Sequence, residues 1–149
     1  MKIAIGSDNN GYVLKESLKQ LLLGMDIDVV DVGTTVFEAV KIDEAPLAVA
    51  KMVASGEVER GILIDATGAA SAIIANKVPG IRAAQVGDYY SARLTKAHND
   101  ANILCFGAGV VGHTTAAECV KIWLETEVMG GNHPLRLEMI RQLEEKYAK

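Results

Sequence analysis

The most informative stretch of this 149-residue chain runs Gly61-Ile-Leu-Ile-Asp65-Ala-Thr67-Gly68-Ala69-Ala-Ser71. It begins with a continuous apolar run, typical of a strand covered on both faces, and continues into small residues of helical pattern. Small side chains leave backbone N–H groups accessible, and a helix N-terminus adds partial positive charge. The turn is therefore predicted to hold an oxyanion or a phosphate. The alternative is that Asp65 or Thr67 simply caps the helix.

On either side of this stretch, short apolar runs alternate with segments of helical periodicity. The predicted strands are Lys2–Gly6, Asp28–Val32, Gly61–Ile64, Ile81–Val86 and Asn102–Gly107. The predicted helices are Gly11–Leu23, Pro46–Ser55, Ala69–Lys77, Asp88–Ala97, Thr114–Glu127 and about Pro134 to Tyr147. No repeat or linker interrupts the pattern, so one domain is expected over residues 1–149. The alternation indicates an α/β fold with a doubly wound, five-stranded parallel sheet, helices on both faces and a ligand site beyond the carboxyl ends of the strands.

Composition argues against several classes of protein. The formal net charge is −4, half of the residues are hydrophobic and 23% are charged. An acidic balance disfavours a nucleic-acid surface, and no apolar run approaches the roughly 20 residues that a membrane helix needs. Cys105 and Cys119 have neither metal-type spacing nor a disulfide framework. Both are expected to be buried, inert thiols in a reducing cytoplasm.

The glycine-rich segment Gly107-Ala-Gly109-Val-Val-Gly112 matches the dinucleotide-binding pattern. That chemistry also needs a following strand that ends in an acidic residue, about 20 residues on, to hold the ribose hydroxyl. Here two helical segments follow, with Met129-Gly130-Gly131 between them and no strand. A tight turn from strand to helix is the better interpretation.

The last predicted helix has little of its own domain left to cover. Its apolar positions are Leu135, Leu137, Met139, Ile140 and Leu143. We therefore expect these apolar positions to dock partly on a second subunit. A purely intrachain role is the alternative.

Two further loops carry polar side chains that allow more than one interpretation. Asp8 follows the first strand, where its carboxylate either caps the next helix or accepts hydrogen bonds from sugar hydroxyls. His98 and Asn99 precede the fifth strand, and a lone histidine in such a loop is usually solvated or helix-capping. His113, at a helix start, is interpreted as structural.

Several of these segments resemble one enzyme family in their order and spacing. They are Lys2-Ile-Ala-Ile-Gly-Ser-Asp8, Ala75-Asn-Lys-Val-Pro-Gly-Ile-Arg-Ala-Ala84, His98-Asn-Asp-Ala-Asn-Ile103, and Gly130-Gly-Asn-His133 with Arg136. The chain is similar, nearly end to end, to ribose-5-phosphate isomerase B and galactose-6-phosphate isomerase. The resemblance implies a Rossmann-like subunit, no metal or organic cofactor, and isomerisation of a phosphorylated sugar through a cis-enediol. It also implies a homodimer or homotetramer in which each site is built from two subunits.

The resemblance further implies roles for individual residues. By position, His98 opens the sugar ring, and Thr67 lines an oxyanion nest together with backbone amides. The expected substrate-binding residues are Asp8 and Asn99 at the sugar hydroxyls, His133 and Arg136 at the phosphate from the neighbouring subunit, and Asn9, Gly68, Ala69 and Ser71 in the loops. Asp65 occupies the position of the catalytic base.

The chain departs from the family's pattern at that base. Most members have Cys-Gly-Thr-Gly where this chain has Asp65-Ala-Thr-Gly68, and Asn9, Ile42-Asp43 and Asn132 replace other sugar or phosphate contacts. One interpretation likens the chain to the A subunit of galactose-6-phosphate isomerase, which gives a histidine in trans to a cysteine-bearing B subunit. A second is a homomeric isomerase with Asp65 as base, although a helix N-terminus lowers the pKa of a carboxyl. A third is a sugar-phosphate-binding homologue that has lost catalysis.

Overall fold

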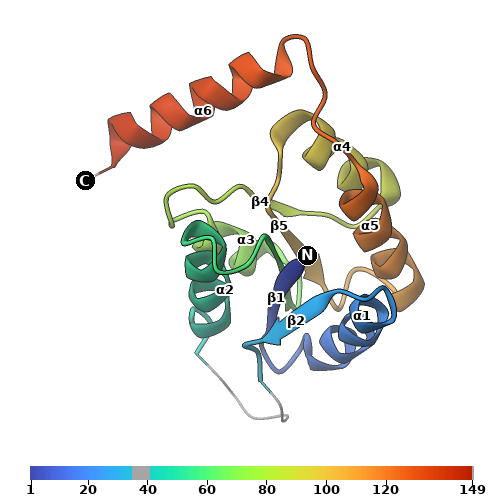
Figure 1. Ribbon diagram of the computed structural model, residues 1–149. Coiled ribbons are helices and arrows are strands. Elements are labelled where there is room, and N and C mark those ends of the chain that lie inside the picture. Colours follow the sequence, from blue (N-terminus) through green and yellow to red (C-terminus); the bar gives the residue numbers. More distant parts are fainter. Residues whose placement is uncertain (35–40, 149) are drawn as a thin grey trace.

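Five strands form one parallel sheet in the computed structural model, which describes residues 1–34 and 41–148 (Figure 1). The strands are β1 (Lys2–Ser7), β2 (Asp28–Asp31), β3 (Arg60–Asp65), β4 (Ala83–Gln85) and β5 (Ile103–Gly107). Their order across the sheet is β2-β1-β3-β5-β4, and every neighbouring pair runs parallel. The predicted five-stranded parallel sheet is confirmed, with β5 placed between β3 and β4.

Each segment with predicted helical periodicity forms a helix. The helices are α1 (Tyr12–Gly24), α2 (Glu44–Ala54), α3 (Ala69–Ala75), α4 (Tyr89–Asn99), α5 (His113–Glu125) and α6 (His133–Tyr147). The ends of helices and strands lie within two residues of the predicted ones. In the described part of the chain, no helix combines the length and the apolar composition that a membrane span requires.

Helices cover both faces of the sheet, because parallel connections have a fixed hand. The chain moves in one direction across the sheet through α1 and α4, and in the other direction through α2 and α3. Such crossovers are right-handed, so the two directions place their helices on opposite faces. Accordingly, α1, α4 and α5 pack on Ile3, Ile5 and Ile62, whereas α2 and α3 pack on Ala4 and Leu63. Burial on both faces explains the continuous apolar runs in the sequence.

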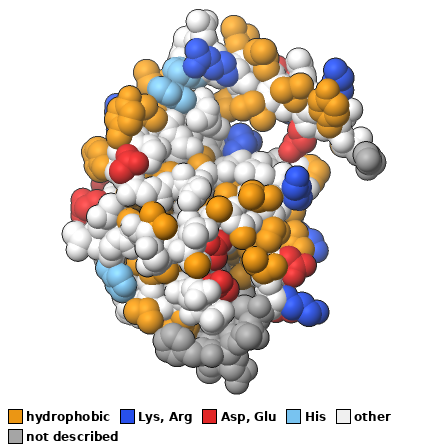
Figure 2. All heavy atoms as spheres, turned by 180° about the vertical axis from the view of Figure 1, so that it is seen from behind, with side chains coloured by type: hydrophobic (Ala, Val, Ile, Leu, Met, Phe, Trp, Pro, Cys, Tyr) orange, Lys and Arg blue, Asp and Glu red, His pale blue; other side chains and the backbone are white. Residues whose placement is uncertain are grey.

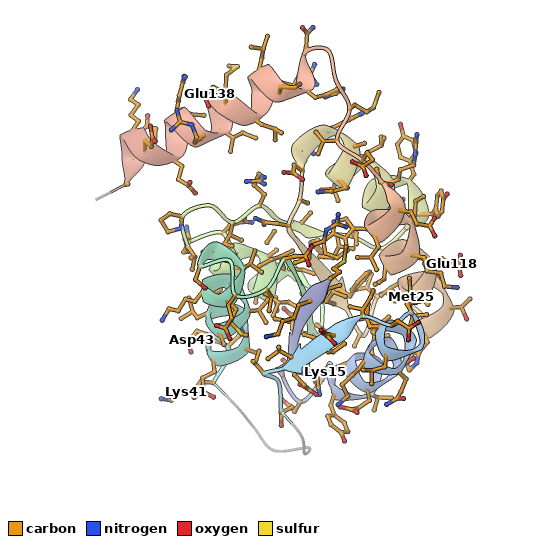
Figure 3. The ribbon with its side chains drawn as sticks, viewed as in Figure 1. Lys15, Met25, Lys41, Asp43, Glu118 and Glu138 are labelled. Carbon is orange, nitrogen blue, oxygen red and sulfur yellow. The ribbon has the colours of Figure 1, made fainter. Side chains whose placement is uncertain are left out.

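A cluster of charges ties β2 to α1. The Lys15 side chain is fully buried, and its Nζ lies 2.5 Å from Asp31 Oδ2 and 2.7 Å from Glu16 Oε1 (Figure 3). Lys19 Nζ lies 2.7 Å from an oxygen of each of the same two carboxylates. Burial raises the pKa of Asp31, but hydrogen bonds from both lysines and from Gly33 N outweigh burial, so the pKa lies below its ordinary value. A buried ammonium of this kind is stable only while its partners stay in place.

Helix α6 stands apart from the sheet (Figure 1). At its start α6 contacts α4, and near its end both carboxylate oxygens of Glu144 lie 2.9 Å from Gly80 N, which donates to them. None of the side chains described for this helix is buried. Leu135, Met139 and Leu143 are each more than half exposed, and Figure 2 shows hydrophobic side chains gathered along the helix. Docking of α6 on a second subunit stays a prediction, because the structure contains one chain.

Candidate functional site

The topology opens a crevice between β1 and β3 at the carboxyl edge of the sheet. The chain leaves β1 toward one face, through α1, and leaves β3 toward the other, through α3, so the two loops diverge. Open α/β sheets bind ligands at such a switch point. A pocket with about 260 Å³ of empty space, open solvent included, lies there, and its polar lining residues are Ser7, Asp8, Lys41, Asp65 and Ser71. Asp8 and Asp65, which come from the two diverging loops, thus line one pocket.

The Asp65 carboxylate is bound by the backbone of its own loop. Its Oδ1 accepts hydrogen bonds from Thr67 N at 2.8 Å and from Gly68 N, and its Oδ2 accepts one from Ser71 N at 2.8 Å. The residue is only 6% exposed. Burial raises the pKa of this carboxyl, but the hydrogen bonds from Ser71, Thr67 and Gly68 outweigh burial, so the pKa lies below its ordinary value. Asp65 therefore occupies amides that would otherwise be available to an oxyanion.

Gly68 gives this loop its shape. Its φ is +80°, and a Cβ built there would lie 2.9 Å from the carbonyl carbon of Phe106. The left-handed backbone and the close approach both favour glycine. The Thr67 side chain is exposed, and its Oγ1 accepts a hydrogen bond from Ala69 N at 3.3 Å. Five of the predicted site residues thus lie together on one loop: Asp65, Thr67, Gly68, Ala69 and Ser71.

The loop after β1 forms the opposite wall of the crevice. Asp8 Oδ1 accepts a hydrogen bond from Gly11 N at 3.0 Å, so part of its role is to close the turn before α1. Asp8 N donates to Ile64 O at 3.2 Å, which ties this loop to β3. Asp8 and Asn9 are both half-buried. The fold therefore places Asp8 and Asn9 at the same edge of the sheet as Asp65.

A second polar group lies where α4 ends and α6 begins. The rings of His98 and His133 are stacked, with centroids 4.4 Å apart and planes inclined by 9°. Among the described residues, His133 Nδ1 is buried without a hydrogen-bond partner. Burial lowers the pKa of His133, and the neighbouring His98 and Arg136 lower it further. Asn99 follows His98, and its carbonyl oxygen accepts a hydrogen bond from Arg82 Nε at 3.1 Å.

Within one chain, the two polar groups lie at opposite edges of the sheet. Asp65 ends β3 and pairs with Gly107 at the end of β5, whereas β5 begins at Ile103, shortly after α4 ends at Asn99. A strand rises about 3.3 Å per residue, so β5 separates the edges by roughly 13 Å. The predicted site residues thus divide into a carboxyl-edge group (Asp8, Asn9, Asp65, Thr67, Gly68, Ala69 and Ser71) and an amino-edge group (His98, Asn99, His133 and Arg136).

Neither cysteine is placed to act as the missing thiol base. Cys105 is buried in β5, and burial together with the charge of Asp65 raises its pKa far above the ordinary value. Cys119 is buried in α5, and burial raises its pKa to about 11. Both thiols are protonated and inaccessible, as predicted. Over residues 1–34 and 41–148, no three His, Cys, Asp or Glu side chains converge as metal ligands would.

Two polar residues of the pocket are not among the site residues predicted from the sequence. Ser7 is 1% exposed, and in the described structure its hydroxyl has no hydrogen-bond partner. Its position at the end of a strand, directly before Asp8, is the signal that could have found it. Lys41 lines the same pocket from the segment before α2 (Figure 3), and nothing in the surrounding sequence marks it.

Comparison with known proteins confirms the resemblance found in the sequence. Residues 3–140 match the ribose/galactose isomerase family. The chain is 43% identical to the galactose-6-phosphate isomerase subunit LacA of Staphylococcus aureus, over 96% of this chain and 99% of that one. Its structure is similar to that of ribose-5-phosphate isomerase B from Clostridium thermocellum, with a TM-score of 0.97 and 47% identity over 99% of this chain and 100% of that one. It is also similar to Mycoplasma genitalium ribose-5-phosphate isomerase B with bound ribulose-5-phosphate, with a TM-score of 0.92 and 32% identity over 97% of each chain. The chain belongs to the ribose/galactose isomerase family.

Proposed function

We propose that this chain is a subunit of a sugar-phosphate aldose–ketose isomerase whose active site is assembled from two subunits. The separation of the carboxyl-edge group from the amino-edge group carries this proposal. Neither group alone combines the pocket at the switch point with the histidines and Arg136. A symmetric pairing of subunits brings the carboxyl-edge group of one beside the amino-edge group of the other.

In the assembled site, a phosphorylated sugar isomerises through a cis-enediol. His98 opens the sugar ring, since an imidazole can both donate and accept a proton. A base takes the proton from C2 of the open aldose and returns it to C1, while one proton leaves the C2 hydroxyl and one is gained by O1. His133 and Arg136 bind the phosphate, and Asp8 and Asn99 bind hydroxyls.

The Asp65 carboxylate is poorly suited to be that base. A base must present a free lone pair to the substrate, and three of the roughly four lone pairs of the Asp65 carboxylate already accept backbone hydrogen bonds. These bonds hold its pKa below the ordinary value, which makes it a weaker proton acceptor. We therefore favour a role like that of an A subunit, in which this chain contributes His98 and a cysteine-bearing B-type subunit contributes the base. The similarity to subunit LacA supports this assignment.

A homomeric isomerase with Asp65 as base is the second candidate. It is favoured by the position of Asp65 in the pocket, across the crevice from Asp8. A bound sugar would exclude water from this pocket, and the added desolvation would raise the pKa of the carboxyl. The similarity to ribose-5-phosphate isomerase B supports this homomeric candidate.

Helix α6 is the element that we propose joins the subunits. Leu135, Met139 and Leu143 are 65%, 62% and 53% exposed. Full burial of each such side chain contributes about 1.5–3 kcal/mol, so a partner that covers them gains a stable contact. The assembly is a homodimer, a homotetramer or a hetero-oligomer with the cysteine-bearing subunit. We place it in the cytoplasm, where the thiols Cys105 and Cys119 stay reduced.

The test measures ketose formation from ribose 5-phosphate, allose 6-phosphate and galactose 6-phosphate. The purified chain is assayed alone and mixed with a cysteine-bearing homologue, and we expect turnover only in the mixture. His98→Asn should lower kcat by about 100-fold or more, because a positioned proton-transfer group contributes about 10²–10⁴-fold. His113→Asn is the matched control, since His113 is exposed at the start of α5 and belongs to neither polar group.

Each outcome separates the candidates. Turnover by the chain alone that Asp65→Asn abolishes, while the free energy of unfolding stays unchanged, identifies the homomeric enzyme with Asp65 as base. Binding of a sugar phosphate without turnover in any mixture identifies the non-catalytic homologue and overturns the isomerase proposal.

A further inference from the structure

Three successive backbone carbonyl oxygens of the loop between β3 and α3 accept hydrogen bonds from donors outside the loop. Asp65 O accepts a hydrogen bond from Ala108 N at 2.8 Å, and Ala66 O accepts one from Gly109 N at 3.0 Å. Thr67 O accepts the third from Gln85 Nε2, at 2.6 Å. The first two donors are backbone groups just after β5, whereas the third is a side chain at the end of β4.

These bonds determine where the amides of the loop point. In a planar trans peptide, the N–H points opposite to the C=O of the same peptide unit. Since the carbonyls of Ala66 and Thr67 are turned toward donors outside the loop, the N–H groups of Thr67 and Gly68 are turned inward. Those two N–H groups donate to Asp65 Oδ1. The outer and inner hydrogen bonds therefore belong to one arrangement of the loop.

We infer that Gln85 is a positioning residue for this site: its side-chain amide fixes the Thr67–Gly68 peptide and thereby aims Gly68 N at Asp65. This inference rests on the proposed function only in that the loop lines the sugar-phosphate pocket. Gln85 acts through the loop, because its side-chain amide bonds to the backbone of Thr67 and not to Asp65 itself.

The loop needs hydrogen bonds from outside because Gly68 does not by itself fix the backbone conformation. Glycine adopts positive and negative φ about equally well, so the Thr67–Gly68 peptide can flip at little intrinsic cost. A flip would turn Gly68 N away from Asp65 and would break the bond from Gln85.

The strand that carries Gln85 is itself fixed by hydrogen bonds. Gln85 pairs with Cys105 across β4 and β5. On the outer side of β4, the side-chain amide of Asn76 exchanges two 2.8 Å hydrogen bonds with the backbone of Ala83. The strand that presents Gln85 is thus bonded on both sides.

The test compares Gln85→Leu, which removes the donor at similar size, and Gln85→Glu, which places an ionised acceptor beside Thr67 O. The matched control is Gln142→Leu on α6, where another exposed glutamine donates to Glu138 Oε1 at 2.9 Å, outside the loop. Two-dimensional ¹H–¹⁵N spectra follow the Gly68 and Thr67 amides. Carbon-detected titration follows the Asp65 carboxyl, and calorimetry follows binding of ribose 5-phosphate and galactose 6-phosphate.

We expect both Gln85 variants to displace the Gly68 amide resonance and to raise the pKa of Asp65 toward its ordinary value of about 3.9. Affinity for the sugar phosphate that the unmodified chain binds should fall about three- to tenfold, the effect of one neutral hydrogen bond. If the Gly68 amide resonance and the pKa of Asp65 in both Gln85 variants equal those of the unmodified chain, the inference is wrong, whatever the binding data show. If the unmodified chain binds neither sugar phosphate while the Gly68 resonance moves as expected, the proposed function fails and the positioning role of Gln85 holds.

Discussion

Replacement of Asp65 by Asn tests whether this carboxylate holds the loop or transfers protons. In the folded chain the two carboxylate oxygens accept three backbone hydrogen bonds, from Thr67, Gly68 and Ser71. Asparagine keeps one acceptor oxygen, and its NH₂ group would face an N–H that needs an acceptor. The substitution therefore weakens the loop even though it preserves size and shape.

The magnitude follows from those bonds. A hydrogen bond to a charged group contributes about 1.5–3 kcal/mol, and an unsatisfied buried N–H costs about 1–3 kcal/mol. Since the asparagine oxygen retains part of the interaction, we expect the free energy of unfolding to fall by about 3 kcal/mol at pH 7. For a domain of this size, that corresponds to a midpoint lowered by roughly 6–12 °C.

The loss should also depend on pH in a defined direction. The pKa of Asp65 is lower in the folded chain than its ordinary value, which is about 3.9 in the unfolded chain. Its charge therefore stabilises the fold fully above that value, and this stabilisation disappears as the pH falls through the folded-state pKa. The difference between the unmodified chain and Asp65→Asn should be constant near neutral pH and should shrink below about pH 4.

Urea unfolding at several pH values, followed by the fluorescence of the buried Trp123, measures this difference. Asp88→Asn is the control, because Asp88 is an exposed cap whose carboxylate accepts hydrogen bonds from the backbone N–H and the hydroxyl of Ser91 at the surface, and the loss should be smaller. Unchanged stability in Asp65→Asn at pH 7, together with lost turnover by the chain alone, would refute the structural role and assign the base to Asp65.

Three other substitutions test the packing and the assembly. Asp31→Asn removes a carboxylate from the buried Lys15 ammonium, and we expect urea unfolding to show a loss of about 3–5 kcal/mol. Gly68→Ala places a Cβ 2.9 Å from the Phe106 carbonyl carbon at a φ of +80°, and the same assay should show a loss of about 2 kcal/mol or more. Leu143→Asp puts a charge on the exposed apolar face of α6, and sedimentation velocity should show monomers in place of the assembly.

One control serves the two stability measurements, and each substitution has a contradicting result. Glu118→Gln breaks an exposed pair with Lys121 and should change the free energy of unfolding by less than about 0.5 kcal/mol. An equally small change in Asp31→Asn would show that Lys15 does not depend on Asp31. Full stability of Gly68→Ala would show that the loop relaxes around a side chain. An assembly unaffected by Leu143→Asp would show that subunits join through a surface other than this face of α6.

The fold could be predicted because its strands are buried on both faces and its helices have clear periodicity. Strand order could not, because it depends on pairing between distant segments. The edge strand shows a local limit. Ile81–Val86 is predicted as a strand, but β4 spans only Ala83–Gln85, and just before it Arg82 N donates to the side chain of Asn102 instead of to a backbone carbonyl. A side-chain acceptor of this kind takes the place of one backbone acceptor in the sheet, and the hydrophobic pattern of the sequence does not reveal it.

The residues of the site could be named from motifs, but their chemistry could not. Burial and a helix N-terminus shift the pKa of Asp65 in opposite directions, and the sequence gives no means to compare them. The structure adds the hydrogen bonds from Thr67, Gly68 and Ser71, and these decide the direction. Gln85 was not found because its bond to Thr67 O joins a side chain to a backbone carbonyl 18 residues away.

The central claim is that one subunit's amino-edge group completes a site on another subunit's carboxyl-edge loop. The most direct measurement is a crystal structure of the assembled protein with a sugar phosphate bound, in which the distance from the His98 imidazole to the nearest such loop of a neighbouring subunit is read. A small sugar spans the gap between the groups that act on it, so we predict a distance of about 10 Å or less. If His98 faces away from the 65–68 loop, or its counterpart, in every subunit pairing, the two-subunit site does not exist.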